Sequence, residues 1–164
     1  MANAFDVRKS TILIIDDDSI SRSYLRSSLL SMECENILEA SKAIKAIDIC
    51  ERHRPDIIFL DIDLDGTDGI DIIKDLSEHL NEHYIVMVSA HGTVENVKRA
   101  IDNGARGFIV KPFTIGKVQQ AMDGAMKHLK TQDQVTLEVP ARQDGASLDT
   151  AEPTNDQADN GASS

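Results

Sequence analysis

The chain has 164 residues, a hydrophobic fraction of 41% and a net charge of −11 at pH 7. This composition is typical of a globular protein with one domain, and the acidic charge argues against non-specific nucleic-acid binding, which needs a basic surface. No apolar run approaches the ~20 residues of a membrane-spanning helix, and no signal peptide is visible, so we expect a soluble, cytoplasmic protein. The two cysteines, Cys34 and Cys50, fit neither a metal-binding nor a disulfide pattern.

Short apolar runs alternate with amphipathic patterns between residues 10 and 130. The runs predict five buried parallel strands, at residues 11–15, 36–40, 56–60, 84–88 and 107–110. Apolar residues spaced by three and four predict a helix after each strand. Five such units predict an α/β domain, a doubly wound parallel sheet with helices on both faces.

Cap and turn residues mark some of the predicted helix ends. We expect Ser41 and Thr93 to cap the second and fourth helices, and Gly104 to end the fourth. We expect the third helix to include Ile70 and to carry Asp71 in its first turn, where a negative charge is favoured.

The composition changes at Thr131. Residues 131–164 carry seven acidic residues and one arginine, a net charge of −6, and their few apolar residues have no period. We therefore expect a domain at residues 10–130 and a disordered acidic C-terminal tail at residues 131–164, with no second domain. The tail is expected to aid solubility, with partner binding as the alternative.

Polar side chains follow four of the five predicted strands. Ligands of an open parallel sheet bind outside the carboxyl ends of its strands, so these side chains should converge on one site. The second strand ends at Ala40 and Ser41 without such a group, which suits an edge position. The converging residues are Asp16, Asp17 and Asp18 after the first strand, Asp61 after the third, Ser89 after the fourth and Lys111 after the fifth.

This set of side chains predicts a magnesium-dependent phosphorylation. Clustered carboxylates repel one another, and a divalent cation removes the repulsion. Oxygen ligands without His or Cys favour Mg²⁺, which commonly works beside phosphate. A carboxylate can attack phosphorus to form an aspartyl-phosphate, and Lys111 and the Ser89 hydroxyl would then help to neutralise and position the phosphoryl oxygens. Each residue alone would be an ordinary turn or cap residue, so the prediction rests on their joint placement.

Four motifs resemble the receiver domain of two-component response regulators. They are IIDDDS at 14–19, FLDIDLDGTDG at 59–69, VSAHG at 88–92 and GFIVKPF at 107–113. The resemblance covers residues 10–130 and implies a flavodoxin-like (βα)₅ fold with strand order 2-1-3-4-5.

The resemblance also implies roles in phosphorylation. Asp61 resembles the phosphoacceptor, and Lys111 resembles the lysine that pairs with the phosphoryl oxygens. Asp17 resembles the direct Mg²⁺ ligand, Asp16 its partner acting largely through water, and Asp63 a ligand through its backbone carbonyl. The peptide bond between Lys111 and Pro112 is expected to be cis.

Further positions resemble the family's switch and lifetime residues. Ser89 resembles the switch hydroxyl, and Phe108 the aromatic switch that is often Tyr in the family, with a plain core aromatic as the alternative. Asp63 and His91 lie where residues flank the incoming water, and we expect their side chains to tune self-hydrolysis unless both merely face solvent. Asp65 departs from the family pattern, which often has proline there.

The implied function is phosphorelay signal transduction. The protein would accept a phosphoryl group on Asp61 from a partner histidine kinase or phosphotransfer protein, catalysing only its own phosphorylation and dephosphorylation. Phosphorylation would switch a protein-binding surface on the fourth helix, fifth strand and fifth helix. We expect no DNA-binding output domain and neither nucleic acid nor membrane as a partner.

Two alternatives remain at this point. The run DLDGT at 63–67 resembles the nucleophile motif of haloacid-dehalogenase-type phosphatases. In those enzymes the nucleophile directly ends a strand and acidic metal ligands follow the lysine, whereas here the strand ends two residues earlier and the acidic cluster precedes the lysine. The second alternative is a receiver-like binding module that signals without phosphorylation, which would lack some of the site residues.

Overall fold

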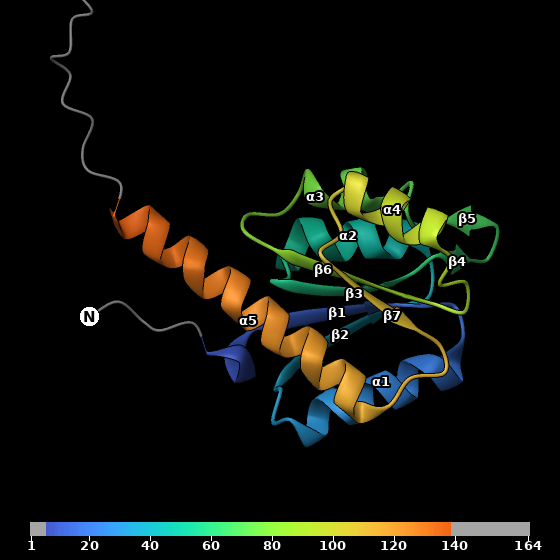
Figure 1. Cartoon of the computed structure of the whole chain (residues 1–164), viewed down its shortest axis with the longest axis horizontal. Coiled ribbons are helices and arrows are strands. Elements are labelled where there is room, and N and C mark those ends of the chain that lie inside the picture. The colour runs from blue at the N-terminus through green and yellow to red at the C-terminus, as the bar shows by residue number, and fades with distance from the viewer. Residues whose placement is uncertain (1–5, 139–164) are drawn as a thin grey trace, which may run out of the picture.

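The computed structural model describes residues 6–138, with side chains described as far as residue 132. Five parallel strands form one sheet in the order β2-β1-β3-β6-β7 (Figure 1). Their bounds are β1 Thr11–Ile15, β2 Asn36–Ala40, β3 Ile57–Asp61, β6 Tyr84–Ser89 and β7 Gly107–Val110. Because β6 and β7 are the fourth and fifth strands of this sheet, the predicted order 2-1-3-4-5 is confirmed, as is the flavodoxin-like fold.

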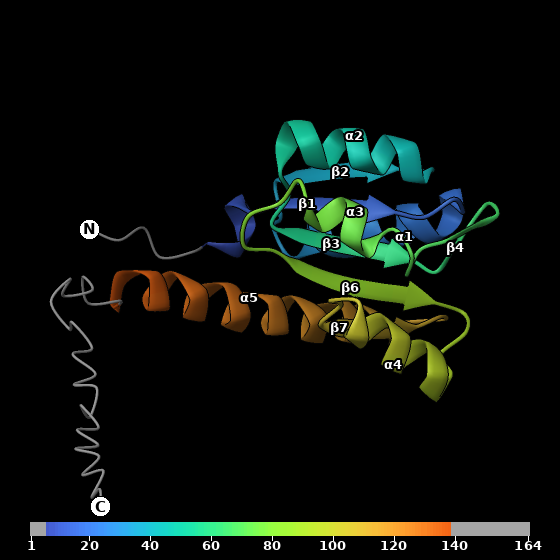
Figure 2. The ribbon, with the colours of Figure 1, turned by 90° about the horizontal axis from the view of Figure 1, so that it is seen from above.

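Within residues 6–138, five α-helices cover the two faces of the sheet. Figures 1 and 2 show α1 and α5 on one face and α2, α3 and α4 on the other. A short 3₁₀ helix, Val7–Lys9, precedes β1. The α-helices are α1 Ser19–Ser31, α2 Ala43–His53, α3 Ile73–Ser77, α4 Val94–Asp102 and α5 Ile115–Glu138.

The core has two layers because successive side chains of a strand point to opposite faces. In β1, Ile12 and Ile14 are buried with the side chains of α1 and α5, and Leu13 and Ile15 with those of α2 and α3. Burial on both faces explains why the central strands read as continuous apolar runs.

A small antiparallel hairpin precedes α3 and changes the predicted third helix. Its strands are β4 Asp63–Leu64 and β5 Thr67–Asp68, paired as Asp63 with Asp68 and Leu64 with Thr67. The chain then turns, with the Asp71 N–H donating to Asp68 O at 3.1 Å, and α3 begins only at Ile73. The predictions that Ile70 lies in the helix and Asp71 in its first turn are therefore wrong.

Of the three predicted helix-end residues, two are confirmed and one is wrong. Thr93 Oγ1 accepts a hydrogen bond from the Asn96 N–H at 3.2 Å, and Gly104 follows α4 with a φ of +112°, so both assignments are confirmed. The N-cap position of α2 is Lys42, with no side-chain cap, so the prediction for Ser41 is wrong by one residue.

The last helix passes the predicted domain boundary. Residues 131–138 continue α5, and residues 139–164 of the predicted tail lie outside the described residues. Between residues 6 and 138, no helix has the length and apolar character needed to cross a membrane.

Candidate functional site

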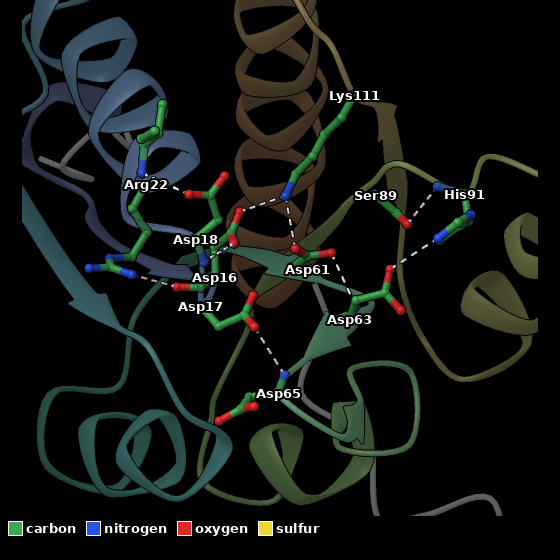
Figure 3. Close-up of polar contacts among 11 residues, drawn as sticks. Asp16, Asp17, Asp18, Arg22, Asp61, Asp63, Asp65, Ser89, His91 and Lys111 are labelled. Atoms are coloured by element: carbon green, nitrogen blue, oxygen red, sulfur yellow. Dashed lines mark hydrogen bonds and ion pairs between the residues drawn. The ribbon is translucent and has the colours of Figure 1, made fainter.

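The predicted site residues meet at the carboxyl ends of the strands (Figure 3). The chain leaves β1 toward α1 and leaves β3 toward the hairpin, so the loops that follow these two neighbouring strands lie at the same end of the sheet. Asp16 follows β1, Asp61 is the last residue of β3, and Lys111 follows β7. Segments that are far apart in the sequence therefore supply one cluster of charged groups.

Lys111 bridges two buried carboxylates. Its Nζ lies 2.8 Å from Asp16 Oδ2 and 2.8 Å from Asp61 Oδ2. Asp16 is 4% exposed and Asp61 5% exposed, so the ammonium neutralises charges that water reaches poorly. The bond between Lys111 and Pro112 is cis, as predicted.

The pKa values of Asp61 and Lys111 are shifted by their burial and by their closeness to each other. Burial raises the pKa of Asp61, and it outweighs the opposing hydrogen bonds from Lys111 and from the Asp63 N–H. Burial works against the charge of Lys111, but the carboxylates of Asp16 and Asp61 outweigh it and raise the pKa of Lys111. The lysine thus keeps its proton while the phosphoacceptor candidate is desolvated.

Three carboxylates lie close enough together that they could hold a cation. Asp16, Asp17 and Asp61 each offer one oxygen, and these oxygens lie within 4.8 Å of one another. The donors are hard oxygens, which fits Mg²⁺ by its ligand preference. Asp18 takes a different part, because its Oδ1 caps α1 by accepting the Ile20 N–H at 3.0 Å.

Backbone N–H groups of the loop after β3 donate hydrogen bonds to Asp61 and Asp17. The Asp63 N–H donates to Asp61 Oδ1 at 3.1 Å, and the Asp65 N–H donates to Asp17 Oδ2 at 3.1 Å. The Asp63 side chain points away from Asp61 toward His91, with Oδ2 3.5 Å from Nε2 (Figure 3). These two side chains are 64% and 65% exposed, so they face solvent and also pair with each other beside the site.

The predicted switch residues lie at different depths. Ser89 is fully buried at the end of β6, and its Oγ accepts the His91 N–H at 3.0 Å. Phe108 is half-buried on the edge strand β7 and packs against the core layer that includes its β6 neighbour Met87. The structure brings Ser89 to the site and leaves Phe108 in the hydrophobic layer beside it, so the switch roles stay predictions.

Sequence reasoning missed two contributors to the site. Arg22 on α1 donates from Nη1 to the Asp16 carbonyl at 2.8 Å, and no local pattern signals this contact. The hairpin turn at Asp65 and Gly66 did have a signal, because Asp-Gly between alternating residues favours a two-residue hairpin loop.

Comparisons with known proteins agree with this geometry. Residues 12–123 match the family model described as response regulator receiver domain. The chain is 34% identical over 112 residues to chemotaxis protein CheY of Bacillus subtilis (strain 168), covering 68% of this chain and 93% of CheY. It is 29% identical over 111 residues to sporulation initiation phosphotransferase F of the same organism, covering 68% and 89% of the two chains.

A solved structure matches at similar identity. The receiver domain of NtrX from Brucella abortus gives a TM-score of 0.65 at 31% identity, covering 71% of this chain and 98% of that domain. The family model spans more than half of the chain. The chain therefore belongs to the response regulator receiver domain family, whose members act in two-component signalling.

Proposed function

We propose that this protein works in a phosphorelay by accepting a phosphoryl group on Asp61. The observation that carries the proposal is the position of Lys111, 2.8 Å from Asp61 and 2.8 Å from Asp16, beside a three-carboxylate cation site. A buried carboxylate with a neighbouring cation site and a fixed ammonium has the parts that phosphoryl transfer requires.

The proposed donor is the phosphohistidine of a partner histidine kinase or phosphotransfer protein. An Asp61 carboxylate oxygen attacks phosphorus, and a new P–O bond forms as the P–N bond breaks. The electron pair of that bond returns to the imidazole nitrogen. Lys111 moves from the free carboxylate to the transferred phosphoryl oxygens, and the Ser89 hydroxyl lies at the end of the neighbouring strand to approach them.

The cation site belongs to the proposed chemistry. Asp16, Asp17 and Asp61 would hold Mg²⁺, together with the Asp63 backbone carbonyl, and Mg²⁺ would supply charge neutralisation for the phosphoryl oxygens. The protein catalyses only its own phosphorylation and dephosphorylation. In dephosphorylation, water attacks phosphorus and releases the Asp61 carboxylate, and we propose that Asp63 and His91 control its approach.

Output would come from the surface of α4, β7 and α5. Phosphorylation would shift Ser89 and Phe108 and so change which protein partner this surface binds. We propose output by protein contact in the cytoplasm, with residues 10–130 as the receiver domain and residues 131–164 as an acidic tail. An acidic chain is poorly suited to bind nucleic acid directly.

The phosphatase alternative loses support from the hairpin. In that reading Asp63 would be the nucleophile at the end of a strand, yet Asp63 is exposed in a two-residue strand. Asp61, and not Asp63, ends the central strand β3.

The test is to incubate the full chain with Mg²⁺ and acetyl phosphate and to measure its intact mass. We expect one phosphoryl adduct, lost in Asp61→Asn and kept in Asp71→Asn, whose carboxylate lies in the exposed turn after the hairpin. An adduct that survives Asp61→Asn, or none in the unchanged protein, would contradict the proposal.

A further inference from the structure

The hairpin at residues 63–68, here called the 63–68 hairpin, has a turn that suits its sequence. Its two loop residues, Asp65 and Gly66, have φ values of +42° and +85°. A two-residue loop with positive φ at both positions is the type I′ turn, for which Asp-Gly is a favoured pair. The buried Leu64 anchors the hairpin in the core, while Asp65 and Gly66 are exposed. The sequence thus specifies both the turn and its attachment.

This turn places a backbone donor against a candidate cation ligand. The Asp65 N–H donates to Asp17 Oδ2 at 3.1 Å, joining two loops that are 48 residues apart in sequence (Figure 3). Asp17 is exposed, and an exposed carboxylate without a partner samples several rotamers. A carboxylate has two oxygens, so one can accept the hydrogen bond while the other faces Asp16 and Asp61. The contact therefore holds Asp17 in a cation-binding orientation.

The residue type at position 65 decides whether this contact can exist. Proline has no N–H and a φ fixed near −65°, so it could neither donate to Asp17 nor adopt the observed φ of +42°. The Asp65 N–H is therefore a hydrogen-bond donor that proline at this position would lack.

The other strand of the hairpin is fixed to helix α4. Arg99 Nη2 lies 2.9 Å from Asp68 Oδ2, and Asp68 Oδ1 accepts the Ile70 N–H at 2.9 Å. Leu64 on the first strand of the hairpin is buried in the core, and Asp68 on the second strand is bound to α4. Both strands that flank the turn are therefore anchored. A donor on a fixed turn orients its acceptor better than one on a free loop.

We propose that the 63–68 hairpin is a positioning element for the cation site, acting through the Asp65 N–H on Asp17, and that it sets the affinity for Mg²⁺. This inference rests on the proposed function in one respect, namely that Asp17 is a Mg²⁺ ligand. Hydrogen bonds to ligating side chains typically account for a 10–100-fold difference in metal affinity.

The first experiment measures the Mg²⁺ dissociation constant of the full chain by calorimetry for two variants of Asp65. Asp65→Pro removes the N–H together with one negative charge, whereas Asp65→Asn removes the same charge and keeps the N–H. Comparing these two variants separates the loss of the charge from the combined loss of the N–H and of the turn geometry. We expect the dissociation constant of Asp65→Pro to exceed that of Asp65→Asn about 10-fold.

A second pair of variants, at Gly66, tests the same proposal in case Asp65→Pro does not fold. A Cβ added at Gly66 meets no atom within 4 Å, so the main effect of a substitution there is on the backbone, whose φ is +85°. Gly66→Val opposes the positive φ and should weaken Mg²⁺ binding, whereas Gly66→Asn tolerates it and should not. Far-UV circular dichroism of each variant without Mg²⁺ reports whether the fold is intact.

The outcomes separate this inference from the proposed function. If the unchanged protein fails to bind Mg²⁺, both are overturned. If it binds Mg²⁺ and each pair of variants has equal dissociation constants, only the positioning role is overturned. If Asp65→Pro does not fold, the comparison of Gly66→Val with Gly66→Asn decides.

Discussion

Arg22 donates a hydrogen bond from Nη1 to the backbone carbonyl of Asp16 at 2.8 Å, which ties helix α1 to the loop that precedes it. The same guanidinium lies 3.5 Å from Glu39 on the edge strand β2, from its Nε to the Glu39 Oε1. One partly buried side chain thus joins the acidic loop, the helix that follows and the edge of the sheet.

The first prediction concerns this contact. Arg22→Met should lower the free energy of unfolding by about 1–2 kcal/mol, because the Asp16 carbonyl loses a charged donor in a partly buried place. Urea denaturation measures the change. The matched control is Arg26→Met, since Arg26 also pairs with Glu39 but is more exposed and makes a longer bond, 3.3 Å, to the Ile37 carbonyl. Equal, small losses in both variants would show that the contact with Asp16 does not matter.

The second prediction concerns the pH dependence of stability. The Asp61 pKa is raised above its ordinary value of 3.8, first because the carboxyl is buried. Between the unfolded and folded pKa values the folded protein binds more protons, so this group's contribution to stability is present at low pH and is lost as pH rises through that window. Asp61→Asn should therefore be more stable than the unchanged protein at pH 7, without Mg²⁺.

Denaturation at a series of pH values measures this difference. The stability gained by Asp61→Asn should grow as pH rises above about 4 and then level off. A gain that stays constant from pH 3 to pH 7 would assign the effect to packing and not to the buried charge.

A third prediction uses the cation site. If Mg²⁺ binds the folded state alone, a concentration of 100 times the dissociation constant should raise the free energy of unfolding by about 2.7 kcal/mol. The shift should disappear with a chelator and should shrink strongly in Asp17→Asn. Thermal melts with and without Mg²⁺ measure it, and Asp48→Asn on α2 serves as a control outside the site.

The fourth prediction addresses the exposed pair of Asp63 and His91. Replacing both with alanine should speed dephosphorylation several-fold, because we propose that this exposed pair, 3.5 Å apart, restricts the approach of water to Asp61. The decay of the intact-mass adduct gives the rate. The control replaces Asp48 and Arg52, an exposed pair on α2 at 2.9 Å, with alanine. An unchanged lifetime in the first double variant would remove the proposed role.

The sheet could be predicted from sequence because its strands are buried on both faces. Such strands are continuous apolar runs, and the bounds of each agree with the prediction to within one residue. The strand β3 is shifted by one residue, to Ile57–Asp61, and β6 is extended by one, to Ser89. The order of strands came from the family resemblance, although the lack of a charged group after β2 already suggested an edge position.

The third helix could not be predicted because two patterns compete in the same segment. Ile70, Ile73 and Leu76 have helical spacing, and all three are indeed buried. However, the Asp-Gly turn uses the preceding residues in the 63–68 hairpin, and the chain needs a further turn before helical geometry begins. Burial was therefore predicted correctly for residues whose secondary structure was not.

Within the candidate site, the sequence indicated which residues come together but not their contacts. Asp16, Asp17 and Asp18 are chemically identical in the sequence, and only the fold distinguishes them: Asp16 is a buried partner of Lys111, Asp17 accepts the Asp65 N–H of the hairpin, and Asp18 caps a helix. Each of these contacts except the cap joins residues far apart in the chain. Local patterns carry no information about such pairs.

Helix α5 offers a site for attaching a label or a surface linker away from the acidic site. It begins beside the acidic site and runs past the opposite end of the sheet (Figures 1 and 2). Its 24 residues span roughly 36 Å at ~1.5 Å per residue. A dye or a surface linker attached at the far end of α5 would therefore leave the Asp61 end unobstructed, so that immobilised protein could still meet a phosphodonor.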